Sequence, residues 1–99
     1  MTYNIYRIPK EKASKATSVV YQDNIVSRQS ITIRDARALG IETDERILLI
    51  EGSPEALAHA DTILKELAVK ETEENSKKIY EKFKEEENTI LSATSIFGE

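Results

Sequence analysis

His59 is the only histidine in the chain, so any Ser-His-Asp arrangement would have to use it. Metal motifs built on two histidines are excluded for the same reason. At about 100° per residue, the helix expected here places His59 with Glu55 and Glu66 on the side away from the core. A general base works best in a partly buried cleft. We therefore expect a solvated histidine, and we predict no catalytic residue and no metal site.

Acidic side chains cluster at Glu73–Glu74 and at residues 85–87. Both clusters lie in charged runs where water screens the carboxylates and nothing apolar raises a pKa, so they are typical of a solvated helix face. The chain has no cysteine, which excludes thiolate nucleophiles, disulfides, iron-sulfur clusters and cysteine-rich zinc sites. We predict that the protein is not an enzyme and needs no cofactor.

The run Gly52-Ser53-Pro54 precedes an expected helix, and helix N-termini can bind anions through their free N–H groups. The run contains a single glycine and no following lysine, so it lacks both phosphate-loop patterns. Glu51 and Glu55 would also repel an anion. We expect Ser53 to be the helix N-cap and Pro54 the first helical residue.

Basic residues form the one constellation with a coherent external partner. Residues 1–42 carry seven basic and four acidic groups, whereas residues 43–99 carry seven basic and fourteen acidic groups. The candidate polyanion-binding residues are Arg7, Lys10, Lys12, Lys15, Arg28, Arg34 and Arg37. Tyr3, Tyr6 and Tyr21 could stack on bases if they are exposed near these residues.

The nucleic-acid hypothesis remains the alternative, because the formal net charge of -4 disfavours a polyanion partner for the whole chain. No Gly-x-x-Gly loop and no aromatic RRM strand motif is present. The opposite charges of the two halves could equally complement each other in a dimer.

The first half of the chain predicts two strands and a helix. Residues 2–8 carry apolar groups on both faces of a strand that stops at Pro9. Residues 9–22 favour a helix, although residues 17–26 could instead form a hairpin. An extended pattern covers residues 25–33. A short helix follows over residues 34–39, with Thr32 and Asp35 as a capping box, Gly40 as a left-handed cap, and Arg34 and Arg37 on one exposed face.

The second half contains the clearest pattern. Residues 46–51 (RILLIE) form a continuous apolar run, typical of a strand buried on both faces, and residues 54–68 have an apolar stripe at helical spacing. The run RILLIEGSPEALAHADTILKEL resembles the strand-helix unit of KH-like and ferredoxin-like domains. This resemblance covers about a fifth of the chain, concerns structural residues, and implies a fold class without a site.

The C-terminal part allows two interpretations. Residues 70–78 have no hydrophobic side chain and predict either a polar linker or an exposed helical bridge. Residues 79–99 predict a C-terminal helix, in which Ile90 and Leu91 finish the apolar stripe. Alternatively, residues 89–97 form a last strand that returns to the sheet.

Together these elements predict one domain over residues 1–99, of the α+β class. We expect a two-layer sandwich with ferredoxin-like order (βαββαβ) and amphipathic helices on one face. A small parallel or mixed sheet with helices on both faces is the alternative. The expected core consists of Leu48, Ile50, Leu57, Ile63, Leu64 and Leu67, with contributions from Ile5, Ile33, Leu39 and Phe83.

The function expected from these observations is that of a small non-catalytic intracellular binding module that interacts with a protein partner or with itself as a homodimer. An RNA- or DNA-binding domain that uses the basic N-terminal half is the alternative. No apolar run is long enough to cross a membrane, and residues 1–8 lack the pattern of a secretory signal, so we expect a cytoplasmic protein.

Overall fold

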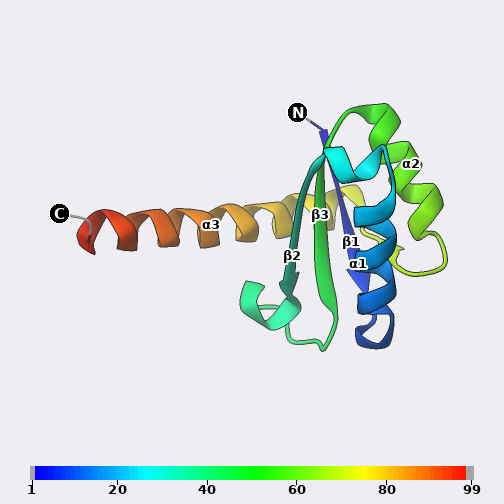
Figure 1. The fold of residues 1–99 in the computed structure, drawn as a ribbon. Helices are drawn as coiled ribbons and strands as arrows, with labels where there is room; N and C mark the ends of the chain where they lie inside the picture. Colours follow the sequence, from blue (N-terminus) through cyan, green and yellow to red (C-terminus); the bar gives the residue numbers. More distant parts are fainter. Residues whose placement is uncertain (1, 98–99) are drawn as a thin grey trace.

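The computed structural model describes residues 2–97, with side chains described through Glu86. It is a small α+β fold with a four-stranded antiparallel sheet and three α-helices (Figure 1). The elements are β1 (Thr2–Ile8), α1 (Ala13–Gln22), β2 (Ser30–Asp35), β3 (Arg46–Gly52), α2 (Pro54–Leu64), β4 (Val69–Lys70) and α3 (Glu73–Phe97). Three-residue or four-residue 3-10 turns lie at Lys10–Lys12, Val26–Arg28 and Ala36–Leu39.

The strand order is β2-β3-β1-β4, so the two strands with the strongest apolar patterns occupy the centre of the sheet. β1 pairs with β3 along its whole length, from Thr2 opposite Gly52 to Ile8 opposite Arg46. β2 pairs with β3 alone, and β4 contributes only two residues opposite β1. The predictions of strands at residues 2–8 and 46–51 are confirmed.

α1 and α2 cover one face of the sheet, which we call the α1/α2 face. Even-numbered residues of β1 and β3 point into this layer, because side chains alternate along a strand. The buried cluster here consists of Tyr6, Ile8, Ala16, Val20, Val26, Leu48, Ile50, Leu57, Ala60 and Leu64. Ile63 and Leu67 were expected in the core but are only partly buried at the rim of this cluster.

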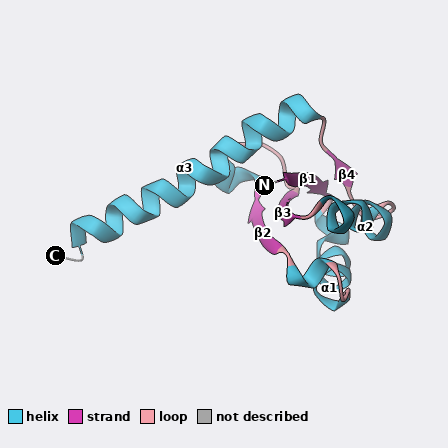
Figure 2. Ribbon diagram, turned by 90° about the horizontal axis from the view of Figure 1, so that it is seen from above, coloured by secondary structure: helices cyan, strands magenta, loops and turns pink. Residues whose placement is uncertain are grey.

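α3 covers the opposite face, which we call the α3 face (Figure 2). Ile5, Ile47 and Leu49 on the strands meet Ile79 and Phe83 of α3 in a second buried cluster, together with Ala36 and Leu39. The expectation that all helices lie on one face is therefore wrong. Both central strands are apolar on both sides, and a two-layer arrangement would leave Ile5, Ile47 and Leu49 in water.

Residues 17–26 form no hairpin, because α1 continues to Gln22 and a 3-10 turn begins at Val26. The predicted strand at residues 25–33 is thus shortened at its start. The short helix predicted at residues 34–39 is a 3-10 turn that begins at Ala36. The capping box is also wrong, since Thr32 lies within β2 and the side chain of Asp35 makes no cap hydrogen bond, whereas Gly40 has the predicted left-handed conformation with φ 78°.

The boundary at Ser53 is confirmed, because its side chain accepts a hydrogen bond of 3.2 Å from the backbone N–H of Ala56. α2 ends at Leu64 rather than near residue 68, and the chain turns there into β4. α3 begins at Glu73, where Thr72 accepts a hydrogen bond from the backbone N–H of Asn75. The alternative of a last strand over residues 89–97 is wrong, since these residues continue α3.

Candidate interaction surface

The seven basic candidates are spread over both faces and several elements. Arg7 lies on β1, Lys10 and Lys12 on the first 3-10 turn, and Lys15 on α1. Arg28 ends the second 3-10 turn, Arg34 lies on β2, and Arg37 lies on the third 3-10 turn. Arg34 and Arg37 therefore do not share a helix face as expected, because Arg34 belongs to a strand. The structure does not gather the seven side chains into one patch.

Three of the arginines already have acidic partners within the fold. Arg7 Nη2 lies 2.6 Å from Glu45 Oε1, and this hydrogen bond raises the pKa of the Arg7 guanidinium. Arg34 Nε lies 2.6 Å from Glu86 Oε1. Arg37 Nη2 lies 3.1 Å from Asp44 Oδ1, which lowers the pKa of the Asp44 carboxyl. Much of the positive charge expected for a polyanion is thus neutralised locally.

Lys12 donates a hydrogen bond to the backbone carbonyl of Glu66. Within residues 2–86, the side chains of Lys10, Lys15 and Arg28 have neither a hydrogen bond nor an ion pair. Lys10 and Lys15 lie near the start of α1 and Arg28 lies beyond its end, so they do not form one site.

The three tyrosines expected as stacking platforms differ in their environments. Tyr6 is buried in the core. Tyr3 stacks on Tyr80 of α3, with the ring centroids 4.2 Å apart. Tyr21 is exposed. Only one of the three thus presents a free aromatic ring.

The sequence predicts a solvated histidine, but the side chain of His59 has a partner within the fold. Its Nε2 atom lies 2.8 Å from Asp23 Oδ1. The other carboxylate oxygen of Asp23 accepts the backbone N–H groups of Ile25 and Val26. The hydrogen bond from Val26, followed by that from His59, lowers the pKa of Asp23. The pair fastens α2 to the turn after α1, and no nucleophile adjoins the ring among the described contacts.

The turn before α2 is filled by protein groups. A Cβ atom at Gly52 would collide with the side chain of Gln29, so the glycine makes room for that amide. Thr2 Oγ1 donates to the Gly52 carbonyl at 2.5 Å, and Ser53 caps the helix. These contacts support the structural role expected for this turn.

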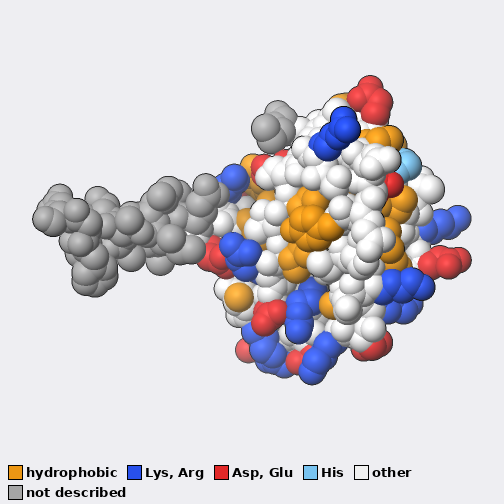
Figure 3. All heavy atoms as spheres, in the orientation of Figure 1, with side chains coloured by type: hydrophobic (Ala, Val, Ile, Leu, Met, Phe, Trp, Pro, Cys, Tyr) orange, Lys and Arg blue, Asp and Glu red, His pale blue; other side chains and the backbone are white. Residues whose placement is uncertain are grey.

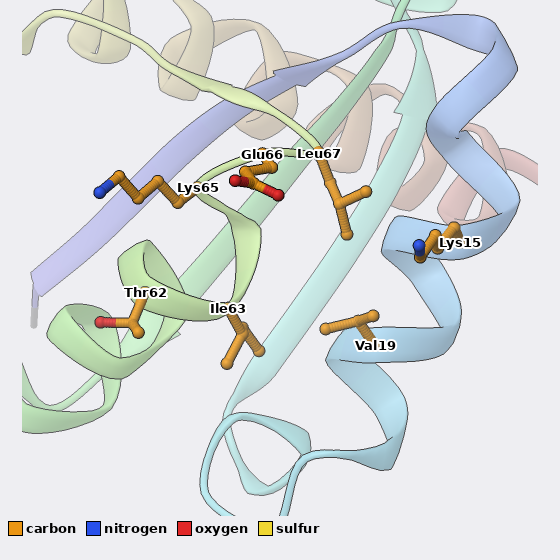
Figure 4. A pocket seen from close by; sticks show the side chains of 7 residues that line it. All are labelled: Lys15, Val19, Thr62, Ile63, Lys65, Glu66 and Leu67. Carbon is orange, nitrogen blue, oxygen red and sulfur yellow. The ribbon is translucent and has the colours of Figure 1, made fainter.

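The groove between α1 and α2 has a volume of about 370 Å³ and is lined by seven residues (Figure 4). Ile63 and Leu67 point toward Val19 across the groove, while Thr62 and Lys65 point away from it. The groove has an apolar floor and a charged rim. Throughout the part of the chain that is described, no group of three or more His, Cys, Asp or Glu side chains could hold a metal ion.

A different surface stands out at the edge formed by β2. The backbone groups that face outward can be deduced from the register. Glu71 donates its N–H to the Ile5 carbonyl, so Ile5 faces β4 and its neighbour Tyr6 faces β3. The direction of these backbone groups alternates from one residue to the next along each strand. When this alternation is applied through β3 to β2, the N–H and C=O groups of Thr32 point to β3. The corresponding groups of Ile31 and Ile33 therefore form the free edge of β2.

The side chain of Arg34 wraps around this free edge. Its Nη1 atom donates to the Ile33 carbonyl at 2.9 Å, while Nε binds Glu86 on α3. The carbonyl contact agrees with the outward direction deduced for Ile33. The ion pair marks the place where α3 passes the edge of the sheet.

An apolar patch adjoins the free edge on the α1/α2 face. The space-filling view shows hydrophobic side chains gathered over the sheet in this region (Figure 3). The side chains of Ile31 and Ile33 are only partly buried at the margin of the α1/α2 cluster. β2 thus carries outward-facing backbone groups with no strand partner, of which the Ile33 carbonyl is bound by Arg34, beside incompletely covered isoleucines. This combination invites strand pairing.

α3 leaves the sheet on the same side. Beyond the contact with β2, its ribbon runs clear of all four strands (Figures 1 and 2). We call residues 88–97 of α3 the projecting segment. Its sequence, NTILSATSIF, contains no charged residue. By contrast, every residue from 81 to 87 is charged except the aromatic Phe83.

Sequence reasoning missed this surface. The interpretation of residues 89–97 as a strand concealed the projecting segment, and the free edge depends on which strands become neighbours. Among the described residues, no helix is both long and apolar enough to cross a membrane. The chain matches no family model, no curated protein and no solved structure.

Proposed function

We propose that this chain is a small non-catalytic interaction module whose contact surface consists of the free edge of β2 and the projecting segment of α3. The observation that carries the proposal is the uncharged composition of the projecting segment. A helix surrounded by water is normally polar on all sides or supported by many charge pairs. Residues 88–97 have neither property.

The helix-forming tendency of this segment supports the same conclusion. It is rich in β-branched residues and serines, which are weaker helix formers than Ala, Leu, Glu or Lys. Short helices without tertiary contacts are marginal in water. The helical conformation of residues 88–97 is therefore best stabilised by contact with a protein partner.

The order of the elements supports a ferredoxin-like topology as part of this proposal. The sequence β1-α1-β2-β3-α2-β4 follows the βαββαβ order, and the sheet order β2-β3-β1-β4 places β1 and β3 at its centre. In this interpretation α3 is an addition that covers the second face. A cytoplasmic location is also part of the proposal, and it rests on the absence of cysteine.

Site-specific photo-crosslinking tests the proposed function. A photoreactive amino acid is introduced at Leu91 in the projecting segment and, as the matched control, at the exposed Thr62 of α2. The full-length protein is expressed in its own cells, irradiated, and analysed by mass spectrometry. We expect a crosslink to a polypeptide from position 91 and none above background from position 62. Equal yields from the two positions, or none from either, would refute the proposal.

A further inference from the structure

We infer that the partner is a second copy of this chain, joined by antiparallel pairing of β2 with β2 about a two-fold axis through Thr32. This inference rests on the proposed function, because it identifies the partner of the same surface. It depends on three observations, which are the register of outward-facing groups on β2, the charges at its two ends, and the direction of α3.

The register follows from symmetry. A two-fold axis normal to a sheet leaves each side chain on its own face and sets residues at equal distances from the axis opposite each other. An axis through Thr32 therefore sets Ile31 opposite Ile33 of the partner subunit. Ile31 and Ile33 carry the outward-facing backbone groups of β2. In the single chain the Ile33 carbonyl accepts from Arg34 Nη1 at 2.9 Å, so pairing replaces this contact with a backbone hydrogen bond. Each such pair exchanges both N–H···O=C hydrogen bonds, and Thr32 forms the close pair at the centre.

The same register covers the apolar patch. Ile31 and Ile33 of both copies meet on the α1/α2 face, where each is only partly buried in the single chain. β-branched cross-strand pairs of this kind stabilise antiparallel sheets. Thr32 meets Thr32 of the partner subunit on the α3 face, a favourable pair for the same reason.

Charge distinguishes this axis from its neighbours. With the axis at Thr32, Arg28 of each copy lies one residue beyond the position facing Asp35 of the partner subunit. Arg28 has no ion pair among residues 2–86, whereas Asp35 already pairs with Arg46 at 2.9 Å but keeps 66% of its side chain exposed, so that Arg28 of the partner subunit would add a second cation beside it. An axis at Ile31 would set Arg28 opposite Arg34 of the partner subunit, which brings two like charges together. An axis at Ile33 would set the apolar Ile31 opposite the charged Asp35 of the partner subunit.

α3 supplies the remainder of the interface. A six-residue strand alone covers little surface, whereas stable interfaces bury about 800 Å² per partner. α3 leaves the sheet past β2, where Glu86 binds Arg34 (Figure 2). A copy paired at β2 therefore lies directly beneath the projecting segment. Symmetry then sets the two α3 helices antiparallel across the joined sheets.

Charge substitutions at the axis test this arrangement in the full chain. Sedimentation equilibrium from micromolar to millimolar concentration should show a dimer for the unchanged protein. Thr32→Lys and Thr32→Glu should each weaken dimerisation more than about tenfold, because like charges then lie directly opposite each other. An equimolar mixture of the two variants should restore the dimer, since Lys then faces Glu. Restoration on mixing also shows that neither variant has lost its fold.

Two further variants complete the test. Thr62→Lys makes the same chemical change at an exposed position of α2 and should leave the dimer unchanged. Ile90→Glu introduces a charge into the projecting segment and should also weaken dimerisation more than about tenfold. A monomer at all concentrations, or a dimer that survives both Thr32 substitutions, would overturn the inference. If position 91 crosslinks only to a different protein, the proposed function stands and the two-fold dimer does not.

Discussion

The hydroxyl of Tyr6 donates a hydrogen bond of 2.6 Å to Asp61 Oδ1, and this contact joins the buried strand β1 to α2. Lys70 Nζ lies 3.0 Å from the other oxygen of Asp61, and Asn4 donates to the Tyr6 hydroxyl. These two contacts of Asp61 hold α2 over the edge of the sheet where β4 is only two residues long, and the contact of Asn4 orients the Tyr6 hydroxyl within β1. Burial, followed by the bond to Asp61, raises the pKa of Tyr6.

Replacing Tyr6 by Phe should lower the free energy of unfolding by about 1.5–3 kcal/mol, the range for a hydrogen bond to a charged group. Urea unfolding at neutral pH measures the change. Tyr3→Phe is the matched control, because the Tyr3 hydroxyl has no hydrogen bond within residues 2–86 while its ring stacks on Tyr80. Equal losses in the two variants would contradict a specific role for the Tyr6 hydroxyl.

Leu64 is 1% exposed and lies in the α1/α2 cluster, so Leu64→Ala leaves a cavity there. We expect this variant to lose about 2–5 kcal/mol of unfolding free energy. Ile25→Ala provides the control, since this side chain is 48% exposed and its removal should change stability by no more than about 0.5 kcal/mol. Thermal and urea unfolding report both values, and an unchanged melting temperature for Leu64→Ala would refute its placement in the core.

The contact between Asp23 and His59 predicts a dependence of stability on pH. The pKa of Asp23 is lowered from 3.8, first by the backbone N–H of Val26 and then by other partners that include His59. A depressed carboxyl pKa stabilises the fold above 3.8, and this contribution is lost as the pH falls through the lowered pKa. Acid titration followed by circular dichroism should therefore show a smaller acid-induced loss for Asp23→Asn than for the unchanged protein. Glu11→Gln, an exposed substitution with the same change in charge, should follow the unchanged protein.

Sequence patterns located the central strands because their signals were long and unambiguous. Residues 46–51 form a continuous apolar run, and this run became the strand between β1 and β2. The turn at Ser53 was equally clear, since the cap, the proline and the following acid agree. Both features depend on local sequence, and the structure kept them.

The features that were missed depend on tertiary contacts. β4 has only Val69 and Lys70, and Leu67 and Ala68 before it continue the helical spacing of α2. Pairing with β1 decided the conformation there. In residues 89–97, the β-branched side chains favoured a strand, yet the chain continues α3, and local propensity is a weak guide when it conflicts with the surrounding fold.

The candidate surface was invisible in the sequence for a related reason. Arg34 was counted among the basic residues available to a polyanion, whereas the fold brings it to Glu86, far along the chain. Spacing along a helix could not have predicted this pair, because Arg34 lies on a strand. The polyanion hypothesis remains a prediction, and the paired arginines provide a direct test of it.

Titration with single-stranded RNA at low and moderate salt separates the two functional hypotheses. Because Arg34 and Arg37 already have carboxylate partners, we expect Arg34→Ala and Arg37→Ala to leave any weak association and its salt dependence unchanged. Lys15→Ala serves as a comparison, because its ammonium group has no partner within residues 2–86. Weaker binding and a flatter salt dependence for both arginine variants would favour the nucleic-acid hypothesis.

α3 follows all four strands in the sequence, so it leaves the ribosome after them. β1, β2 and β3 leave the ribosome before Ile79 and Phe83, so Ile5, Ile47 and Leu49 have no helix to cover them until α3 follows. Exposed apolar surface and an unpaired strand edge make such intermediates prone to aggregate. A chaperone that binds nascent chains would therefore find its target on the α3 face, and only until α3 has emerged and docked.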